Sequence, residues 1–458
     1  MPKTSSTLIE DAIIVTMDPR RRVIEGGSIL VEDGRIAGIG RPGAKKLGKA
    51  ERRISAKGMA AIPGLVDTHL HLAQSLLRGC ADDLSLVEWL RQRVWPIQGS
   101  FTREDGRVSA ELSMLEMIRS GTTSFVGVDV VSRYGFDGIA EAVNSAGMRG
   151  ALAKTVMDTA GYGRKGSIMP AGLVEEKEAC IREAKSMIRK WNGTRGGLVR
   201  TWVAPRSLGG CSRELYEEVA ELAKQQKTRV TMHLAEVRED VKYAKENFGM
   251  TPFEFIERVG LARPQSLFAH MVWLTDSDVR RVARTGANVA HCPSSNLKLA
   301  SGIPRVPELL SAGANVGLGC DGAPCNNSYD MIREMKLAAV IQKGRLLDPL
   351  TMPAATVLEM ATVRGARAMG MESEVGSIEE GKKADLVLID LSKPHLTPYR
   401  DIVSNIVYSA MGSDVDTVMV DGKLLLRRGE ALTLDEERIV GLAQRRQDQL
   451  ISRSGVRA

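Results

Sequence analysis

The sequence lacks the features of a disulfide-stabilised or membrane-spanning protein. It has only six cysteines in 458 residues, and no two of them form a Cys-X-X-Cys pair, so free thiols in a reducing compartment are expected. No apolar run approaches the length of a membrane span. The first residues also lack the basic and apolar regions of a signal peptide. We therefore expect a cytoplasmic protein without a membrane partner.

The charge distribution argues against a nucleic-acid-binding protein. The net charge is +7, from 63 Lys and Arg less 56 Asp and Glu, and the tightest basic clusters are residues 20–22 and 445–446, near the two ends. No basic stripe is interleaved with aromatic residues, so nucleic acid is not an expected partner. With 43% hydrophobic and 26% charged residues, the chain has the composition of a globular protein with a sizeable core.

Both ends of the chain have the pattern of β-hairpins. Residues 28–40 read as two short strands around an Asp33-Gly34 turn, and residues 415–426 repeat the pattern around Asp421-Gly422, which is a strong hairpin signal. We expect residues 1–60 and 371–434 to form one composite β-sandwich domain, so that the central domain is an insertion. Residues 435–458 are expected to form a charged C-terminal helix.

Residues 61–370 alternate between short apolar segments and longer helical patterns. Residues 216–226, for example, place largely apolar side chains at helical spacing. Strands that alternate with helices indicate a parallel α/β sheet, and eight such strands over about 300 residues fit a (β/α)₈ TIM-type barrel. The expected barrel strands are Leu65–His71, Thr122–Val128, Gly150–Thr155, Leu198–Ala204, Arg229–Ala235, Ser266–His270, Asn288–His291 and Val316–Asp321.

Five of the six histidines lie at the carboxyl end of an expected barrel strand, where barrel enzymes keep their active sites. These five are His69, His71, His233, His270 and His291. The sixth, His395, lies outside the barrel and is interpreted as structural.

A His-X-His pair and a third imidazole suggest a metal site. Since side chains at positions i and i+2 of a strand point to the same face, His69 and His71 can share one ion. For the pair alone, two polar residues at a strand end are an equal alternative. His233 ends another strand and completes the three protein nitrogens typical of catalytic zinc.

Four further residues have more than one interpretation. Glu236 lies three residues after His233, where it could reach a reacting ligand or be a solvated loop carboxylate. His270 could be a general base or another ligand. Asp321 could bind metal, accept a proton or cap the next helix. His291 could contact substrate, support a ligand or lie in the core.

Taken together, these segments resemble the amidohydrolase superfamily over nearly the full chain. The segments that carry the resemblance are 63–71, 233–236, 269–270, 319–322 and 376–390. Within the superfamily the chain is similar to a branch of S-adenosylhomocysteine/methylthioadenosine deaminases and triazine hydrolases, on residues 76–90, 291–299 and 321–328.

The resemblance implies one divalent metal per chain, usually zinc with iron as an alternative. Its ligands would be His69, His71, His233 and Asp321. His270 would orient or deprotonate the attacking water, Glu236 would protonate a ring nitrogen, and Asp321 would help to protonate the departing amine. Homo-oligomers are common in the family, so a homo-oligomer is expected.

The expected function is hydrolysis of an exocyclic C–N bond of a purine, nucleoside-like or other nitrogen heterocycle. The alternative within the same mechanism is release of chloride or an alkylamine from a triazine. A third alternative, a non-catalytic binding protein, would lack ligands, and none is missing here.

Several residues bear on the substrate. In the deaminases resembled, the residue at the position of Glu88 bonds ribose hydroxyls. Arg206 stands where those deaminases tend to carry histidine, and Lys154 where they carry arginine. Both residues are expected substrate contacts, and both changes argue against S-adenosylhomocysteine as the specific substrate. The other expected substrate contacts are Gln74, His291 and Cys325, and for Cys325 a small buried packing residue is an equal alternative.

Overall fold

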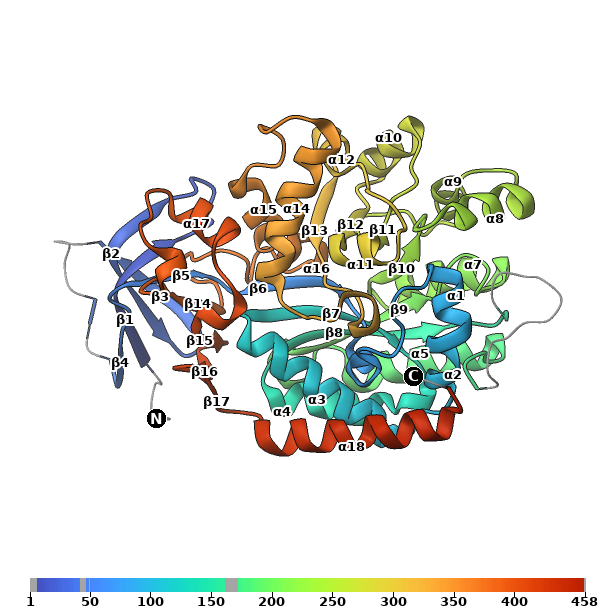
Figure 1. Ribbon diagram of the computed structural model, residues 1–458, viewed down its shortest axis with the longest axis horizontal. Coiled ribbons are helices and arrows are strands. Elements are labelled where there is room, and N and C mark those ends of the chain that lie inside the picture. Colours follow the sequence, from blue (N-terminus) through green and yellow to red (C-terminus); the bar gives the residue numbers. More distant parts are fainter. Residues whose placement is uncertain (1–5, 42–46, 49, 161–171, 457–458) are drawn as a thin grey trace.

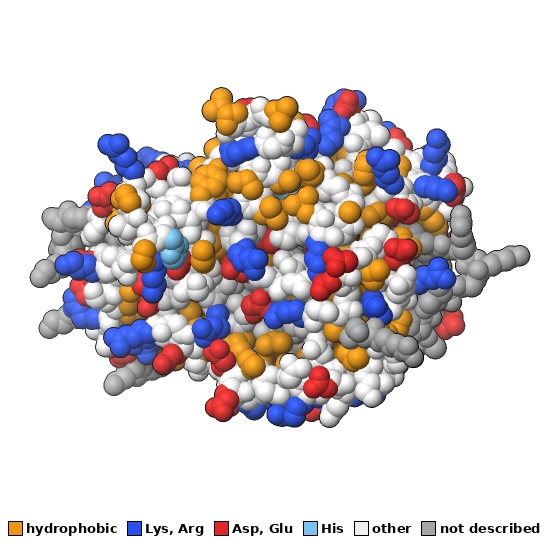
Figure 2. All heavy atoms as spheres, viewed as in Figure 1, with side chains coloured by type: hydrophobic (Ala, Val, Ile, Leu, Met, Phe, Trp, Pro, Cys, Tyr) orange, Lys and Arg blue, Asp and Glu red, His pale blue; other side chains and the backbone are white. Residues whose placement is uncertain are grey.

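The computed structural model describes residues 6–41, 47–48, 50–160 and 172–456. These residues form two sheets. One is an eight-stranded parallel sheet surrounded by helices, and the other is a nine-stranded mixed sheet at one end of the molecule (Figure 1). Lys and Arg side chains are interspersed with Asp and Glu over the face shown in Figure 2.

The eight parallel strands follow one another in chain order around a barrel. They are β6 (Leu65–Leu70), β7 (Thr122–Val130), β8 (Arg149–Val156), β9 (Val199–Pro205), β10 (Val230–Leu234), β11 (Ser266–His270), β12 (Asn288–His291) and β13 (Asn315–Leu318). An isolated bridge between Leu70 and Asp321 and a 2.7 Å bond from Thr68 Oγ1 to the Leu318 carbonyl join the first strand to the last. The predicted (β/α)₈ barrel is confirmed.

Burial on both faces explains why the barrel strands lack strict alternation. Every residue of β8 and β11 is buried, as expected for a parallel sheet covered by helices. Several of the covering helices are amphipathic. In α7 (Arg213–Gln225), Ser212 accepts the N-capping bond from Leu215, and the buried face carries Leu215, Tyr216, Val219 and Leu222.

Further helices cover the barrel and its carboxyl edge. The longer ones are α3 (Arg103–Arg119), α4 (Phe136–Ala146), α5 (Lys177–Trp191), α8 (Arg238–Phe248), α10 (Asp276–Thr285) and α14 (Met331–Leu346). The shorter ones are α1 (Leu86–Trp89), α2 (Trp95–Gly99), α9 (Pro252–Arg258), α11 (Pro293–Lys298), α12 (Val306–Ser311), α13 (Ala323–Asn326), α15 (Ala354–Met360), α16 (Val363–Met369) and α17 (Ile402–Tyr408).

The mixed sheet is built from both ends of the chain. Its strands are β1 (Ser6–Val15), β2 (Val23–Glu32), β3 (Arg35–Gly40), β4 (Arg52–Ser55), β5 (Met59–Pro63), β14 (Leu386–Asp390), β15 (Val415–Val420), β16 (Lys423–Arg427) and β17 (Glu430–Ala431). The two halves meet where β5 pairs antiparallel with β14. Isoleucines of β1 and β2 share a core with leucines of β14.

A buried ion-pair cluster holds this sheet against the amino end of the barrel. The guanidinium of Arg149, the first residue of β8, donates to both oxygens of Asp385 at 3.0 Å and to Asp421 at 2.8 Å. Because Arg149 starts its strand, the mixed sheet lies at the opposite end of the barrel from the histidines. It therefore supports the barrel without lining the site.

The C-terminal helix α18 (Glu436–Ser454) lies along α3 (Figure 1). Arg446 and Arg453 both donate to the buried carboxylate of Asp105 in α3, at 2.8 and 2.6 Å. Among the described residues, no helix has both the length and the apolar composition needed to cross a membrane.

Candidate active site

The closure of the barrel brings the last strand against the first histidine pair. The backbone N–H of Asp321 donates to the His69 carbonyl at 2.8 Å. This approach requires a glycine at position 319, since a Cβ there would lie 2.8 Å from that same carbonyl oxygen. Two residues distant in sequence thus meet at one point of the carboxyl edge.

Three imidazoles and one carboxylate converge there. Nε2 of His71 lies 3.1 Å from Nε2 of His233 and 2.9 Å from Oδ1 of Asp321, which lies 3.4 Å from Nε2 of His69. Donor atoms about 2.05 Å from one tetrahedral zinc ion stand about 3.3 Å apart. The four side chains offer ligand atoms within 4.8 Å of one another, a spacing that fits a single ion.

The protonation of the cluster also suits a metal. His69 is fully buried, its Nδ1 has no hydrogen-bond partner in the described part of the chain, and its Nε2 lies 3.4 Å from Oδ1 of Asp321. Burial lowers its pKa to about 4, which leaves a neutral imidazole with a lone pair to donate. Burial acts to raise the pKa of Asp321, but the bonds to His69 and His71 outweigh it and hold that pKa well below its usual range.

Surrounding residues fix the direction of these donors. Nδ1 of His233 donates to the Arg206 carbonyl at 2.9 Å, which turns its Nε2 lone pair towards the cluster. The Tyr329 hydroxyl donates to the His71 carbonyl at 2.8 Å. The buried carboxyl of Asp67 accepts from the backbone N–H groups of His69 and Cys320, and burial raises its pKa to about 7.

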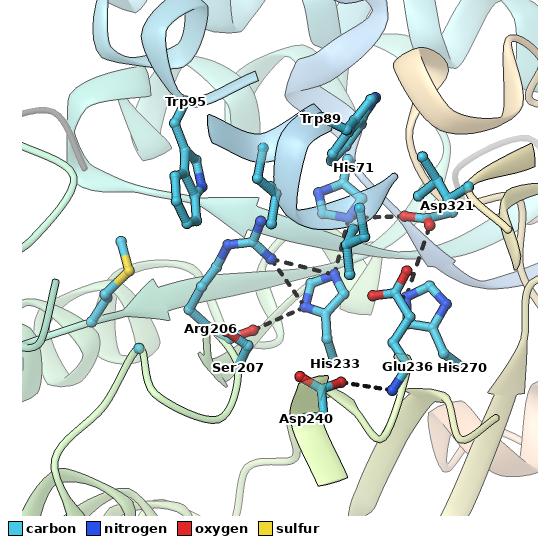
Figure 3. Close-up of a pocket in the computed structure, with 15 residues that line it drawn as sticks. His71, Trp89, Trp95, Arg206, Ser207, His233, Glu236, Asp240, His270 and Asp321 are labelled. Atoms are coloured by element: carbon cyan, nitrogen blue, oxygen red, sulfur yellow. Dashed lines mark hydrogen bonds and ion pairs between the residues drawn. The ribbon is translucent and has the colours of Figure 1, made fainter. Parts of the chain in front are cut away.

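Two groups that can move protons lie beside the cluster (Figure 3). Nε2 of His270 is 3.6 Å from Oε2 of Glu236 and 3.8 Å from Oδ2 of Asp321. Asp240 accepts from the Glu236 N–H at 2.8 Å and so anchors the loop that carries Glu236. Burial raises the pKa of Glu236 to about 7, which suits a group that donates a proton near neutral pH.

The backbone at the site is strained. His270 and Asp321 have φ angles of 72° and 65°, and Ala235, next to Glu236, has a φ of 51°. A non-glycine residue in the left-handed region costs on the order of 1–3 kcal/mol. The surrounding hydrogen bonds maintain these conformations, which aim the side chains at the cluster.

Helix α11 orients both His270 and Asp321. Ser295 Oγ donates to Asp321 Oδ2 at 2.6 Å, and Asn296 Oδ1 lies 2.9 Å from Nδ1 of His270. Because the amide oxygen can only accept, His270 carries its proton on Nδ1 and directs the Nε2 lone pair to the cluster. Sequence reasoning missed these roles and that of Asp240. The polar residues 294–296, which follow the strand that ends at His291, could have indicated the roles of Ser295 and Asn296.

Replacing Asn296 by leucine should lower kcat by about 10- to 100-fold, because His270 then loses the acceptor that fixes its tautomer. Asn296→Asp keeps an acceptor oxygen and should retain most of the activity. Steady-state kinetics of both variants, with metal content measured in parallel, tests this orientation. Equal losses in the two variants would contradict it.

A pocket that is partly open to solvent lies above the cluster. Its apolar lining is Leu86, Trp89, Leu90, Trp95, Met157 and Leu299. Its polar lining is His71, Arg206, Ser207, His233, Glu236, Asp240, His270 and Asp321, with Gly210 beside them.

Arg206 is the one expected substrate contact that lines this pocket. Glu88 is exposed on α1, where it accepts from Ser85 Oγ at 3.1 Å. The Lys154 ammonium lies 3.0 Å from Glu175 and 3.7 Å from Glu183 of α5. Its side chain therefore points to the outer helix layer, and the structure does not bring it to the pocket.

The remaining three expected contacts are buried beside the cluster. Gln74 and Cys325 pack against Gly322, and the Cys325 thiol donates to the Gly322 carbonyl at 3.1 Å. Burial raises the pKa of this thiol well above its usual value. His291 ends β12, and burial lowers its pKa to about 3. None of the three is among the lining residues.

Comparison with known proteins gives a consistent family. The model described as "Amidohydrolase family" matches residues 60–425. A 5'-deoxyadenosine deaminase of Methanosarcina mazei is 39% identical, covering 97% of this chain and 98% of its own. A 5-methylthioadenosine/S-adenosylhomocysteine deaminase of Moorella thermoacetica is 41% identical, covering 96% and 98%.

Solved structures of related hydrolases have the same fold as this chain. An adenosine deaminase from Xanthomonas campestris with bound zinc has a TM-score of 0.92 and 31% identity, covering 98% of this chain and 99% of its own. An atrazine chlorohydrolase from Arthrobacter aurescens complexed with zinc has a TM-score of 0.88 and 25% identity, covering 96% and 100%. These relatives confirm the predicted enzyme class, a metal-dependent hydrolase of C–N bonds. The chain belongs to the amidohydrolase family.

Proposed function

We propose that this protein removes the exocyclic amino group of an adenine nucleoside whose 5' position carries hydrogen or a thioether. The observation that carries the proposal is the convergence of Glu236 and His270 on one three-histidine, one-carboxylate cluster. The names of the relatives at about 40% identity support the choice of nucleoside.

The donor set of His69, His71, His233 and Asp321 fits one zinc ion. Three neutral imidazoles and a carboxylate are typical zinc ligands. When bound, the ion supplies a Lewis acid and a nucleophile at neutral pH.

The side chains of the site then divide the proton transfers. The Glu236 carboxyl donates to N1 of the purine, which makes C6 electrophilic. Nε2 of His270, with its Nδ1–H held by Asn296, accepts a proton from the attacking water. Oδ2 of Asp321, 3.8 Å from Nε2 of His270, relays that proton to the departing amine, and the proton of the new C6 hydroxyl restores the Glu236 carboxyl as ammonia leaves. Trp89 and its apolar neighbours form one wall of the pocket in which these steps take place.

The decisive experiment measures ammonia release by the zinc-loaded protein. The panel is 5'-deoxyadenosine, methylthioadenosine, S-adenosylhomocysteine, adenosine, free adenine and melamine, with chloride release from atrazine measured separately. Turnover of one or more of the first three above the others supports the proposal. Turnover of a triazine with none of any nucleoside would overturn the substrate while leaving the site in place.

A further inference from the structure

The turn that follows α11 brings the hydroxyl of Ser301 to the Glu236 carboxyl. Ser301 Oγ donates to Oε1 of Glu236 at 3.4 Å, and both side chains are buried. The other carboxyl oxygen, Oε2, faces Nε2 of His270 at 3.6 Å, and Figure 3 shows the carboxyl beside the His270 ring. The two oxygens of the proposed proton donor therefore have different neighbours.

The backbone of this turn holds Ser301 in one position. The Ser301 N–H donates to the Asn296 carbonyl at 2.8 Å, and the Ser301 carbonyl accepts from the indole Nε1 of Trp273 at 2.9 Å. The next residue, Gly302, has a φ of 125°, and a Cβ there would lie 2.9 Å from Cγ1 of Val272. A tightly packed turn therefore carries the hydroxyl, and it requires glycine at position 302.

Trp273 connects the turn to the loop that carries Glu236. Its backbone N–H donates at 2.9 Å to the carbonyl of Ala235, the residue before Glu236, and its indole bonds Ser301. The guanidinium of Arg238 lies over the same indole, 4.4 Å from the ring centroid, a contact that stabilises the position of the ring. Both partners of the hydrogen bond between Ser301 and Glu236 are thus fixed to one residue.

Ser301 completes a series of contacts made by residues 295–301, whose side chains bond Asp321, His270 and Glu236. A protonated carboxyl has one O–H donor, and its other oxygen accepts. Because Oε1 accepts from Ser301, the proton is left to Oε2, on the side of His270 and the cluster. We propose that Ser301 is a positioning residue that keeps the acidic proton of Glu236 on Oε2 and so directs it towards the substrate. This inference rests on the proposed function and adds a residue beyond the groups named there.

A double-mutant cycle tests this role. The values of kcat and KM are measured for zinc-loaded wild type, Ser301→Ala, Glu236→Gln and the double variant, on the panel compound that the wild type hydrolyses fastest. Ser301→Ala should lower kcat by roughly 10-fold, which corresponds to one hydrogen bond to an ionisable group, and should change KM less. In the Glu236→Gln background the same replacement should leave kcat within about 2-fold, because the glutamine has no proton to direct.

The controls separate this role from a structural one. Ser311→Ala makes the same chemical change at the exposed end of α12 and should leave kcat and KM unchanged. Zinc content and Tm are measured in every variant, and Ser301→Ala should keep both close to the wild-type values. Loss of zinc in that variant would show that Ser301 supports the metal site instead and would overturn the inference.

The outcomes also separate this inference from the proposed function. If Ser301→Ala lowers kcat by the same factor in both backgrounds, or leaves it unchanged in the wild type, the inference alone is overturned. If the wild type hydrolyses a triazine and no nucleoside, the proposed substrate fails, and the same cycle on the triazine still decides the role of Ser301. If Glu236→Gln has normal turnover, or if no panel compound reacts, the proposed function fails and the inference fails with it.

Discussion

Replacing His233 by alanine should remove the bound metal and lower kcat/KM by about 10⁴-fold or more. The four ligand atoms of the cluster lie within 4.8 Å of one another. The variant keeps His69, His71 and Asp321 but loses the third imidazole, so one of the four ligand positions around the ion is left empty. Without the ion, the pKa of the attacking water stays at its high ordinary value and does not fall to about 7. Elemental analysis should find about one zinc per wild-type chain and almost none in the variant.

Thermal unfolding gives a second measurement of the same change. An ion that binds only the folded state stabilises it by about 2.7 kcal/mol at a free concentration one hundred times its Kd. Added zinc should therefore raise the Tm of the wild type and not that of His233→Ala. His395→Ala is the matched control, because His395 bonds Asp414 outside the barrel. Full activity or stoichiometric zinc in His233→Ala would refute the assigned ligands.

Replacing Glu236 by glutamine should lower the rate of the reaction without loss of the bound metal. The amide has nearly the same shape as the carboxyl but cannot give up a proton to the purine ring. A general acid contributes typically 10²- to 10⁴-fold, so kcat should fall by that factor while zinc content stays at about one per chain. KM should change less than kcat, because the pocket walls are unchanged.

A neighbouring carboxylate provides the control for that variant. Glu239 lies three residues further on, in the first turn of α8, and is exposed. Glu239→Gln makes the same chemical change outside the pocket and should retain normal turnover. Normal turnover by Glu236→Gln would exclude the proton-donor role, and loss of zinc in that variant would show that Glu236 acts on the metal instead.

The barrel was predictable because its strands have a strong local pattern, and strand ends are where side chains must converge. Once His69, His233 and His270 each end a parallel strand, closure of the sheet brings them to one edge. The pairing of His69 with Asp321 follows from the same closure, since the first and last strands of a barrel are neighbours. Two residues that are far apart in the sequence can therefore be neighbours when the barrel closes.

Some side-chain positions could not be predicted from the sequence, because strand periodicity does not determine the direction of each side chain. Lys154 lies two residues before the end of β8, and the direction of its side chain depends on its position in the pleat and on the carboxylates of Glu175, just before α5, and Glu183 in α5. Glu88 depends on how the short helix α1 turns as it crosses the barrel mouth. Asn296 acts through one amide oxygen, and its bond to His270 becomes visible only when α11 is positioned.

The mixed sheet also constrains how the chain folds as it leaves the ribosome. Strands β1–β5 are made first, but the sheet becomes complete only when β5 pairs with β14, Pro63 opposite Leu386. At about 5–20 residues per second, synthesis of the intervening segment takes roughly 15 s to about 1 min. During that time the isoleucine-rich face of β1 and β2 lacks the leucines that cover it in the folded protein. The core shared by β1, β2 and β14 therefore stays incomplete until residues 386–390 have been translated.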